Sequence, residues 1–348
     1  MSERFILYGV EASYFTRKVL ALFAYKELPT DFRRKTLMIA PGIEARAGTR
    51  LMPVVVTPRD EWLWDSTPIA LEMDRRYPAS AVLPETPLLH LTARILEDFF
   101  DEWPTRQALH FRWYDPESRA VGGGSIARDL LGLAQDAQLD AEGEAMVEKV
   151  RSSVESWATK TAAAVGADRS AQPEMEGEFL RLVEILDRHF AGNAFLLGAR
   201  PSLPDFALEG GLAAHFLYDP TPRRLIEAQA PHVVTYHERI AAARASQAPP
   251  WPDEDGFAES LAPLLQHVAL GFHRFLIANH AAIGAGRDHL TLDLGYGARR
   301  LRIRRYTEKT RADTAAVLAD LGDAERRAVE DALDPLGVLE AYRLPPVL

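Results

Sequence analysis

The sequence predicts an α/β domain at the N-terminus, an all-helical domain after it, and a smaller α+β segment at the end of the chain. Short apolar runs alternate with amphipathic helical patterns over residues 1–85. Helical periodicity then continues over residues 88–246. The proline-rich linker QAPPWPDED follows, and a hairpin pattern stands between helical patterns in residues 250–348. With 348 residues, the chain is long enough for two or three packed regions.

Strand and helix patterns follow one another in the order β-α-β-β-β-α in the first region. The apolar run FILYG is a strand, and the helix behind it begins at Ser13. TDFRRKTL alternates as a second strand, and residues 40–48 form a connection that contains proline and glycine. Pro53 marks the start or edge of the third strand, because proline lacks the N–H group of a sheet ladder. EWLWD is the returning strand of a hairpin, and the last helix begins at Asp65 and Ser66.

Charge and composition exclude several classes of protein. The formal charge is −10, whereas a duplex-binding protein needs a concentrated basic face to displace counterions. The one dense basic run, residues 298–306, fits the solvent side of a strand. The chain has no cysteine, which excludes disulfides, thiolate metal sites and a protein-borne sulfur nucleophile. The N-terminal apolar run is too short for a signal peptide, and no segment approaches the roughly 18 apolar residues of a membrane span. We therefore expect a cytoplasmic protein with neither nucleic acid nor a membrane as partner.

Four motifs in the chain carry a resemblance to a known family. They are Ser13 with Arg17 at the first helix, the Met52-Pro53 step, the pair Asp65-Ser66, and the S-x-x-D box of Ser202 and Asp205 in LLGARPSLPDF. Their order and spacing resemble glutathione transferases, which join a thioredoxin-like N-terminal domain to an all-α C-terminal domain. The family has a cis proline at the third strand and a buried helix after the S-x-x-D box. The resemblance covers about residues 5–245, so residues 250–348 are an extra α+β extension.

The resemblance implies that glutathione binds along the first domain as a co-substrate, without a metal ion. The Ser13 hydroxyl would donate to the glutathione thiolate, and Tyr8 near the end of the first strand is the rival donor. A free thiol has a pKa of about 8.5, and lowering it by about two units takes roughly 2.7 kcal/mol. One hydrogen bond to a charged sulfur, about 1.5–3 kcal/mol, together with the positive end of a helix can supply that free energy.

The remaining candidate residues match other parts of glutathione. Met52, just before the proline, would pair with the ligand backbone as an added strand does. Asp65 suits an ammonium group, and Ser66 with the free amides of its helix suits a carboxylate, so this pair fits the γ-glutamyl end. Arg50 or Arg46 would meet the glycine carboxylate at the opposite end, and the sequence does not choose between them.

Three of these assignments have a structural alternative. Ser13 also suits a plain helix N-cap, and so does the pair Asp65-Ser66, because these residue types are favoured there. Tyr8 also suits packing within the sheet.

The second domain begins with a helix over about residues 88–103 that, by resemblance, lines the cleft and the dimer interface. Pro104 ends or kinks it. An insertion at about residues 115–172 contains a glycine triplet, which predicts a flexible loop, and would shape access to the cleft. The candidates for a hydrophobic acceptor pocket are Trp103, Phe111, Trp113 and Tyr114.

Four acidic residues crowd about two turns of the helix over residues 88–103. Together with His110 they suggest a hard-metal or carboxylate-pair site, but their spacing fits a solvated helix face better. No second ligand cluster has a recognisable metal-binding spacing. The four residues are Glu97, Asp98, Asp101 and Glu102.

The pattern of residues 250–348 predicts a segment that is not stable by itself in water. Leu290, Leu292 and Leu294 alternate with polar residues, so one face of the predicted hairpin needs a cover. We expect this extension to dock on the rest of the chain, nearer to the acceptor pocket than to glutathione.

The resemblance therefore implies a glutathione transferase-like enzyme of the detoxification type, and a homodimer. It would activate the thiolate of glutathione for attack on an electrophilic, apolar or aromatic small molecule. The same site could run ether cleavage, isomerisation or dehalogenation, because fold does not decide among them. The alternative is a non-catalytic glutathione- or ligand-binding protein of the same fold.

Overall fold

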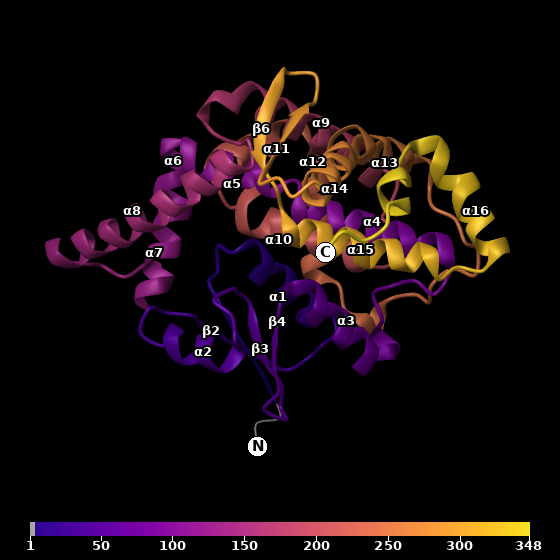
Figure 1. Ribbon diagram of the computed structural model, residues 1–348. Helices are drawn as coiled ribbons and strands as arrows, with labels where there is room; N and C mark the ends of the chain where they lie inside the picture. Colours follow the sequence, from indigo (N-terminus) through magenta and orange to yellow (C-terminus); the bar gives the residue numbers. More distant parts are fainter. Residues whose placement is uncertain (1–3) are drawn as a thin grey trace.

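The computed structural model describes residues 4–348 and has the three predicted regions (Figure 1). The N-terminal domain is a thioredoxin-like α/β unit with a four-stranded mixed sheet in the order β2-β1-β3-β4. β1 and β2 are parallel, and β3 is antiparallel to both of its neighbours. The strands are β1 Phe5–Gly9, β2 Thr30–Arg34, β3 Val54–Val56 and β4 Trp62–Trp64.

The helices of this domain are α1 Tyr14–Tyr25, α2 Ala40–Ala47 and α3 Ser66–Arg76. The starts of α1 and α3 agree with the prediction. α2 occupies what the sequence indicated only as a connection. Pro41 lies in its first turn, where a missing N–H group does no harm, and Gly48 ends it in the left-handed conformation with φ 69°.

The second domain is all-helical, as predicted. Pro104 separates its first two helices, and the capping box of Ser202 and Asp205 is formed at the start of α10. Gly210 lets α10 cross α1 closely, because a Cβ there would lie 2.6 Å from the Tyr14 carbonyl oxygen. The helices are α4 Pro87–Glu102, α5 Thr105–Tyr114, α6 Pro116–Ser118, α7 Gly124–Leu131, α8 Ala141–Ala164, α9 Gln172–Phe190, α10 Leu203–Gly211, α11 Pro220–Gln229 and α12 Pro231–Ala242.

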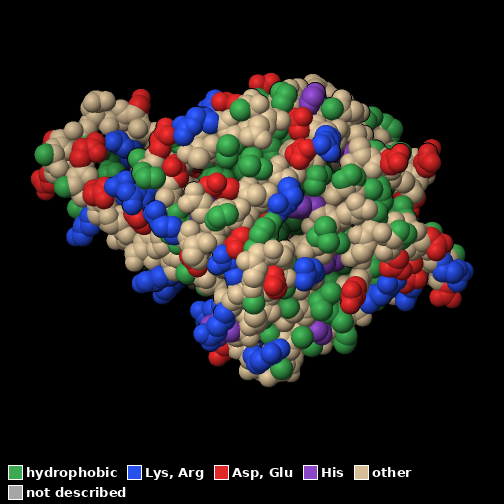
Figure 2. Space-filling view, turned by 90° about the horizontal axis from the view of Figure 1, so that it is seen from above, with side chains coloured by type: hydrophobic (Ala, Val, Ile, Leu, Met, Phe, Trp, Pro, Cys, Tyr) green, Lys and Arg blue, Asp and Glu red, His purple; other side chains and the backbone are tan. Residues whose placement is uncertain are grey.

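The insertion forms a helical arm of α6, α7 and α8 that projects from the body in both views (Figures 1 and 2). The prediction of a flexible loop at the glycine triplet is wrong. Gly122 and Gly123 lie in a wide helical turn over Arg119–Gly123, and Gly124 is the first residue of α7, which follows directly. A Cβ on Gly122 would lie 2.4 Å from Arg112 Nε and from an Asp219 carboxylate oxygen. Glycine is therefore needed here for close packing rather than for flexibility.

The extension contains the predicted hairpin between helices. β5 and β6 pair antiparallel, and Leu290, Leu292 and Leu301 are buried on one face. A wide turn, Ala269–His273, divides the predicted first helix into two. The elements are α13 Ala262–Val268, α14 Arg274–Gly284, β5 His289–Asp293, β6 Ala298–Arg302, α15 Arg305–Ala319 and α16 Asp323–Leu333.

α4 is the centre of the molecule. The extension packs on it through α13, α15 and α16, and every residue of α4 except Pro87 and His90 is buried. The linker also contributes, since the Asp255 carboxylate accepts from the backbone N–H groups of Leu88 and Leu89 at the start of α4. The prediction that this helix lies at a dimer interface is wrong, because the chain itself covers the surface.

One helical stretch departs from the expectation that no segment is long and apolar enough to span a membrane. The run Glu259–Gly284 is, within residues 4–348, one helical stretch apolar enough to cross a membrane, with a mean hydropathy of 1.2. It packs on α4 and α9, and 44% of its apolar window is buried. Acidic and basic side chains are interspersed over the face seen in Figure 2.

Candidate functional site

The sheet register brings the predicted site residues to one edge of the N-terminal domain. Tyr8 lies opposite Val54, and Val54 lies opposite Trp64. The residues just beyond this row are Gly9 at the end of β1, Pro53 before β3 and Asp65 after β4. The loop to Ser13, the Met52-Pro53 step and the start of α3 therefore share this edge, which we call the upper sheet edge.

Ser13 is the N-cap of α1. Its backbone is extended, and its hydroxyl oxygen accepts from Thr16 N–H over a long 3.4 Å. Among residues 4–348, no acceptor takes the hydroxyl hydrogen of Ser13. The side chain is half-buried at the positive end of the helix. Ser13 can therefore cap α1 and still donate to a ligand.

Two buried side chains from the second domain hold the loop before Ser13. Asp129 of α7 accepts from the Glu11 backbone N–H at 2.6 Å. Arg112 of α5 donates to the Ala12 carbonyl at 2.7 Å and forms a buried ion pair with Asp219. The sequence did not predict either contact, because no local pattern links residues about a hundred positions apart. The insertion thus reaches the upper sheet edge through Asp129.

The Met52-Pro53 peptide bond is cis, as the resemblance implies. Within the described residues, neither backbone group of Met52 takes part in a hydrogen bond. Arg50 and Arg46 are both exposed, with the Arg46 guanidinium 5.5 Å from the Trp62 ring centre. The structure, like the sequence, does not choose between these two arginines.

Asp65 and Ser66 begin α3, but Asp65 does not cap it. Its backbone has φ 74°, a conformation that few non-glycine residues adopt, and its side chain makes no cap hydrogen bond. The Asp65 carboxylate instead accepts from the Tyr306 hydroxyl of α15 at 2.5 Å. Ser66 is 4% exposed, so it lies below the surface that Asp65 presents.

Tyr8 packs against Trp62 and α2. Its ring stacks on Trp62 with centroids 6.3 Å apart, and both side chains pack against the small cluster of Ile43, Ala47 and Val54. This placement agrees with the packing alternative for Tyr8.

A buried ion cluster joins α1, α3 and α4 beneath the upper sheet edge. The Lys18 ammonium contacts Glu97 at 2.6 Å and Asp101 at 2.5 Å, and it donates to the Thr67 hydroxyl at 3.2 Å. Burial opposes the charge of Lys18, but the two carboxylates raise its pKa overall. Burial likewise opposes the charge of Glu97, yet Lys18 and Arg94 lower its pKa. This buried cluster joins the first domain to α4.

The other two carboxylates of α4 hold the extension. Glu102 accepts from Arg304 and from the Thr307 hydroxyl, and Asp98 accepts from the Tyr342 hydroxyl at 3.1 Å. Burial raises the pKa of Asp98 to about 8. The prediction of a solvated acidic face on α4 is therefore wrong, since all four carboxylates are buried, two of them against the first domain and two against the extension. Within residues 4–348, no group of three His, Cys, Asp or Glu side chains could hold a metal ion.

Three of the four acceptor-pocket candidates are core residues. Trp103 contacts Phe272 and Phe275 of the extension, and Phe111 contacts Phe179. With exposures of 2–4%, these two side chains and Trp113 cannot line an open pocket, which corrects the prediction. The fourth candidate, Tyr114, is half-buried.

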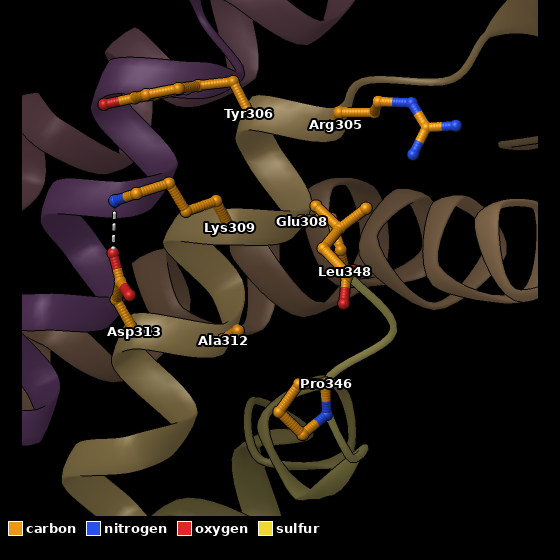
Figure 3. Close-up of a pocket in the computed structure, with 8 residues that line it drawn as sticks. All are labelled: Arg305, Tyr306, Glu308, Lys309, Ala312, Asp313, Pro346 and Leu348. Carbon is orange, nitrogen blue, oxygen red and sulfur yellow. Dashed lines mark hydrogen bonds and ion pairs between the residues drawn. The ribbon is translucent and has the colours of Figure 1, made fainter.

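Two hollows adjoin α15. One, of about 380 Å³, lies between the extension and the start of α3, and it is lined by Trp62, Leu63, Trp64, Asp65, Pro68, Ile69, Tyr306 and Lys309. The other, of about 540 Å³, lies between α15 and the C-terminus (Figure 3). Tyr306, Lys309 and Asp313 extend from one side of α15, whereas Arg305 points the opposite way (Figure 3). Tyr306 and Lys309 belong to both hollows.

Comparison with known proteins identifies the family. The sequence model of the glutathione S-transferase N-terminal domain matches residues 7–81, and that of the glutathione S-transferase C-terminal domain matches residues 144–243. The chain belongs to the glutathione transferase superfamily, as the resemblance predicted. No curated protein matches the chain by sequence.

Three of the solved structures that are similar to this chain are the following. A glutathione S-transferase from Methylobacterium radiotolerans, in complex with glutathione sulfonate, is 19% identical, with 72% of this chain and 97% of that chain covered and a TM-score of 0.43. The beta-etherase LigF from Sphingobium sp. is 14% identical, with 69% and 96% covered and a TM-score of 0.46. FzlA from C. crescentus is 16% identical, with 75% and 99% covered and a TM-score of 0.44.

Proposed function

We propose that this protein is a glutathione-dependent enzyme in which Ser13 donates a hydrogen bond to the glutathione thiolate. The thiolate attacks an electrophilic, apolar or aromatic small molecule, so no covalent intermediate forms on the enzyme. The observation that carries the proposal is the meeting of Ser13, the Met52-Pro53 step and the pair Asp65-Ser66 at the upper sheet edge. They match the sulfur, the backbone and the γ-glutamyl end of one extended tripeptide.

The chemistry needs only modest stabilisation of the thiolate. The Ser13 hydroxyl hydrogen is free for a sulfur, and the unpaired N–H groups at the start of α1 add positive potential. Asp129 and Arg112 fix the loop before Ser13, so the donor is held in place before the ligand arrives. Thiolate formation and proximity to the acceptor would then account for catalysis.

The acceptor would bind against apolar side chains that flank the upper sheet edge. The loop after β2 lies beside Gly9, because the Lys35 backbone N–H donates to the Gly9 carbonyl. This loop and the residue before Met52 carry large apolar side chains at 41–90% exposure, which are Leu37, Met38, Ile39 and Leu51. Their gathering supports an apolar or aromatic acceptor. These side chains do not distinguish among transfer, ether cleavage, isomerisation and dehalogenation as the reaction.

A homodimer, a cytoplasmic location and a role in detoxification remain predictions. If the protein is a dimer, its interface lies away from α4, because the extension covers that helix. Light scattering would decide between one and two copies of the 38.7 kDa chain.

Titration of bound glutathione by thiolate absorbance tests the proposed function. The proposal expects a thiol pKa at least one unit below that of free glutathione, because Ser13 and α1 favour the charged sulfur. Tight binding with an unshifted pKa would instead favour the non-catalytic glutathione-binding protein. Absence of any glutathione binding would refute both.

A further inference from the structure

The hollow between the start of α3 and the extension combines apolar walls with groups of opposite charge. Trp62, Trp64 and Pro68 form part of its walls, and its volume of about 380 Å³ suits a small polar ligand with an aliphatic portion. Its charged groups are the Asp65 carboxylate and the Lys309 ammonium. An amino acid end, with one ammonium and one carboxylate, needs such a pair.

Tyr306 determines how Asp65 is presented. The Tyr306 hydroxyl donates to one carboxylate oxygen of Asp65 at 2.5 Å, which leaves the other oxygen for a ligand. Partial burial, and then the bond to Asp65, raises the pKa of Tyr306, so the hydroxyl stays a neutral donor at physiological pH. Because Asp65 has φ 74° and makes no cap hydrogen bond to α3, this contact from the extension is what orients its side chain.

Lys309 supplies a cation that its present partner holds only weakly. Its ammonium lies 2.8 Å from the Asp313 carboxylate, and both side chains are about half exposed, at 55% and 51%. Exposed pairs of this kind contribute little, so a ligand carboxylate can replace Asp313 without a large penalty. Lys309 is also the one lysine of residues 250–348.

We propose that Tyr306 and Lys309 of the extension complete the subsite for the γ-glutamyl end of glutathione. Tyr306 is a positioning residue that orients Asp65 toward the ligand ammonium, and Lys309 attracts the α-carboxylate beside Ser66 and the free amides of α3. The inference rests on the proposed function. It places the extension at the glutathione end of the site, opposite to the sequence expectation of a role at the acceptor pocket.

Calorimetry on the full chain tests the proposal, with Tyr306→Phe and Lys309→Met as variants. Tyr306→Phe should weaken glutathione binding by about tenfold, as loss of a hydrogen bond to a charged group does, and Lys309→Met should weaken it by about twofold to fivefold, because its ion pair is partly exposed. In turnover assays the change should appear in the KM for glutathione rather than in kcat. Tyr296→Phe is the matched control, since Tyr296 also belongs to the extension and is 42% exposed against 41% for Tyr306.

A second probe separates positioning from a general loss of structure. An analogue of glutathione without the α-amino group has no ammonium for Asp65, so Tyr306→Phe should leave its affinity unchanged, whereas Lys309→Met should still weaken it.

Two results would overturn the proposal. Wild-type affinity for glutathione in both variants would remove the extension from the subsite, and tighter binding by Tyr306→Phe would show that Tyr306 competes with the ligand. A wild-type chain that binds no glutathione would instead refute the proposed function itself.

Discussion

The hydroxyl of one residue, Ser13, carries most of the proposed chemistry. Ser13→Ala removes one hydrogen bond to a charged sulfur, worth roughly 1.5–3 kcal/mol, so turnover at pH 7 should fall by about 10- to 100-fold. Glutathione affinity should change little, and the pKa of the bound thiol should rise toward its free value. Steady-state kinetics at several pH values would measure both effects. Tyr8→Phe is the control, and if it lowers turnover while Ser13→Ala does not, the role belongs to Tyr8.

The carboxyl group of Asp98 makes stability depend on pH. Burial raises its pKa from 3.8 to about 8, with Glu102 and Glu97 adding to the rise and Thr310 and Arg94 opposing it. Between these values the folded chain holds a proton that the unfolded chain has released, so stability should fall as pH rises from about 4 to 8. This one group contributes at most about 1.4 kcal/mol for each pH unit.

Asp98→Asn should therefore reduce the loss of stability with rising pH and stabilise the protein at pH 8. The expected gain is on the order of 1–3 kcal/mol at pH 8, with little change near pH 4. Thermal unfolding across this pH range would measure it, and Asp320→Asn, at an exposed position after α15, is the control. Parallel pH profiles for Asp98→Asn and the wild type would mean that Asp98 titrates normally.

The α7 helix of the insertion holds the loop before α1 in place. Asp129 is fully buried and holds the Glu11 N–H at 2.6 Å and the Arg34 guanidinium at 2.7 Å. Asp129→Ala should destabilise the protein by about 1–3 kcal/mol, because a buried donor loses its acceptor. Amide exchange should quicken in residues 10–14 and turnover should drop.

Hydrogen exchange measured by mass spectrometry, together with the kinetics, would test this role of Asp129. Asp136→Ala, on an exposed part of the same insertion, should change neither. Unaltered exchange in residues 10–14 of Asp129→Ala would remove α7 from any role at Ser13.

The elements themselves show what the sequence could predict. The starts of α1 and α3, the hairpin of β5 and β6, and the break at Pro104 depend on residues within about ten positions of each other, and all were predicted correctly. The contacts that define the site join distant positions. Tyr306 and Asp65 are separated by 241 residues, and Lys18 and Glu97 by 79. The acidic residues of α4 have the spacing of a solvated face, and packing against the first domain and the extension makes them buried.

In the whole molecule, the extension covers one side of α4. Phe99 and Trp103 contact Phe272 and Phe275 across this junction, while Glu102 and Asp98 receive hydrogen bonds from α15 and from Tyr342. Removing residues 250–348 would uncover this apolar and charged surface together. Deletion should therefore give an insoluble or unstable protein, which makes it a poor test of where the extension acts.

Cutting the linker without removing the extension is the better experiment. A protease site placed at residues 252–254, which are exposed, leaves Asp255 in place at the start of α4. After cleavage the two pieces should elute together in gel filtration and separate only in denaturant, because a buried interface of this kind does not depend on the covalent link. Glutathione affinity should also survive, since Tyr306 stays beside Asp65. Pieces that separate on dilution in native buffer would show that the extension is an independent appendage.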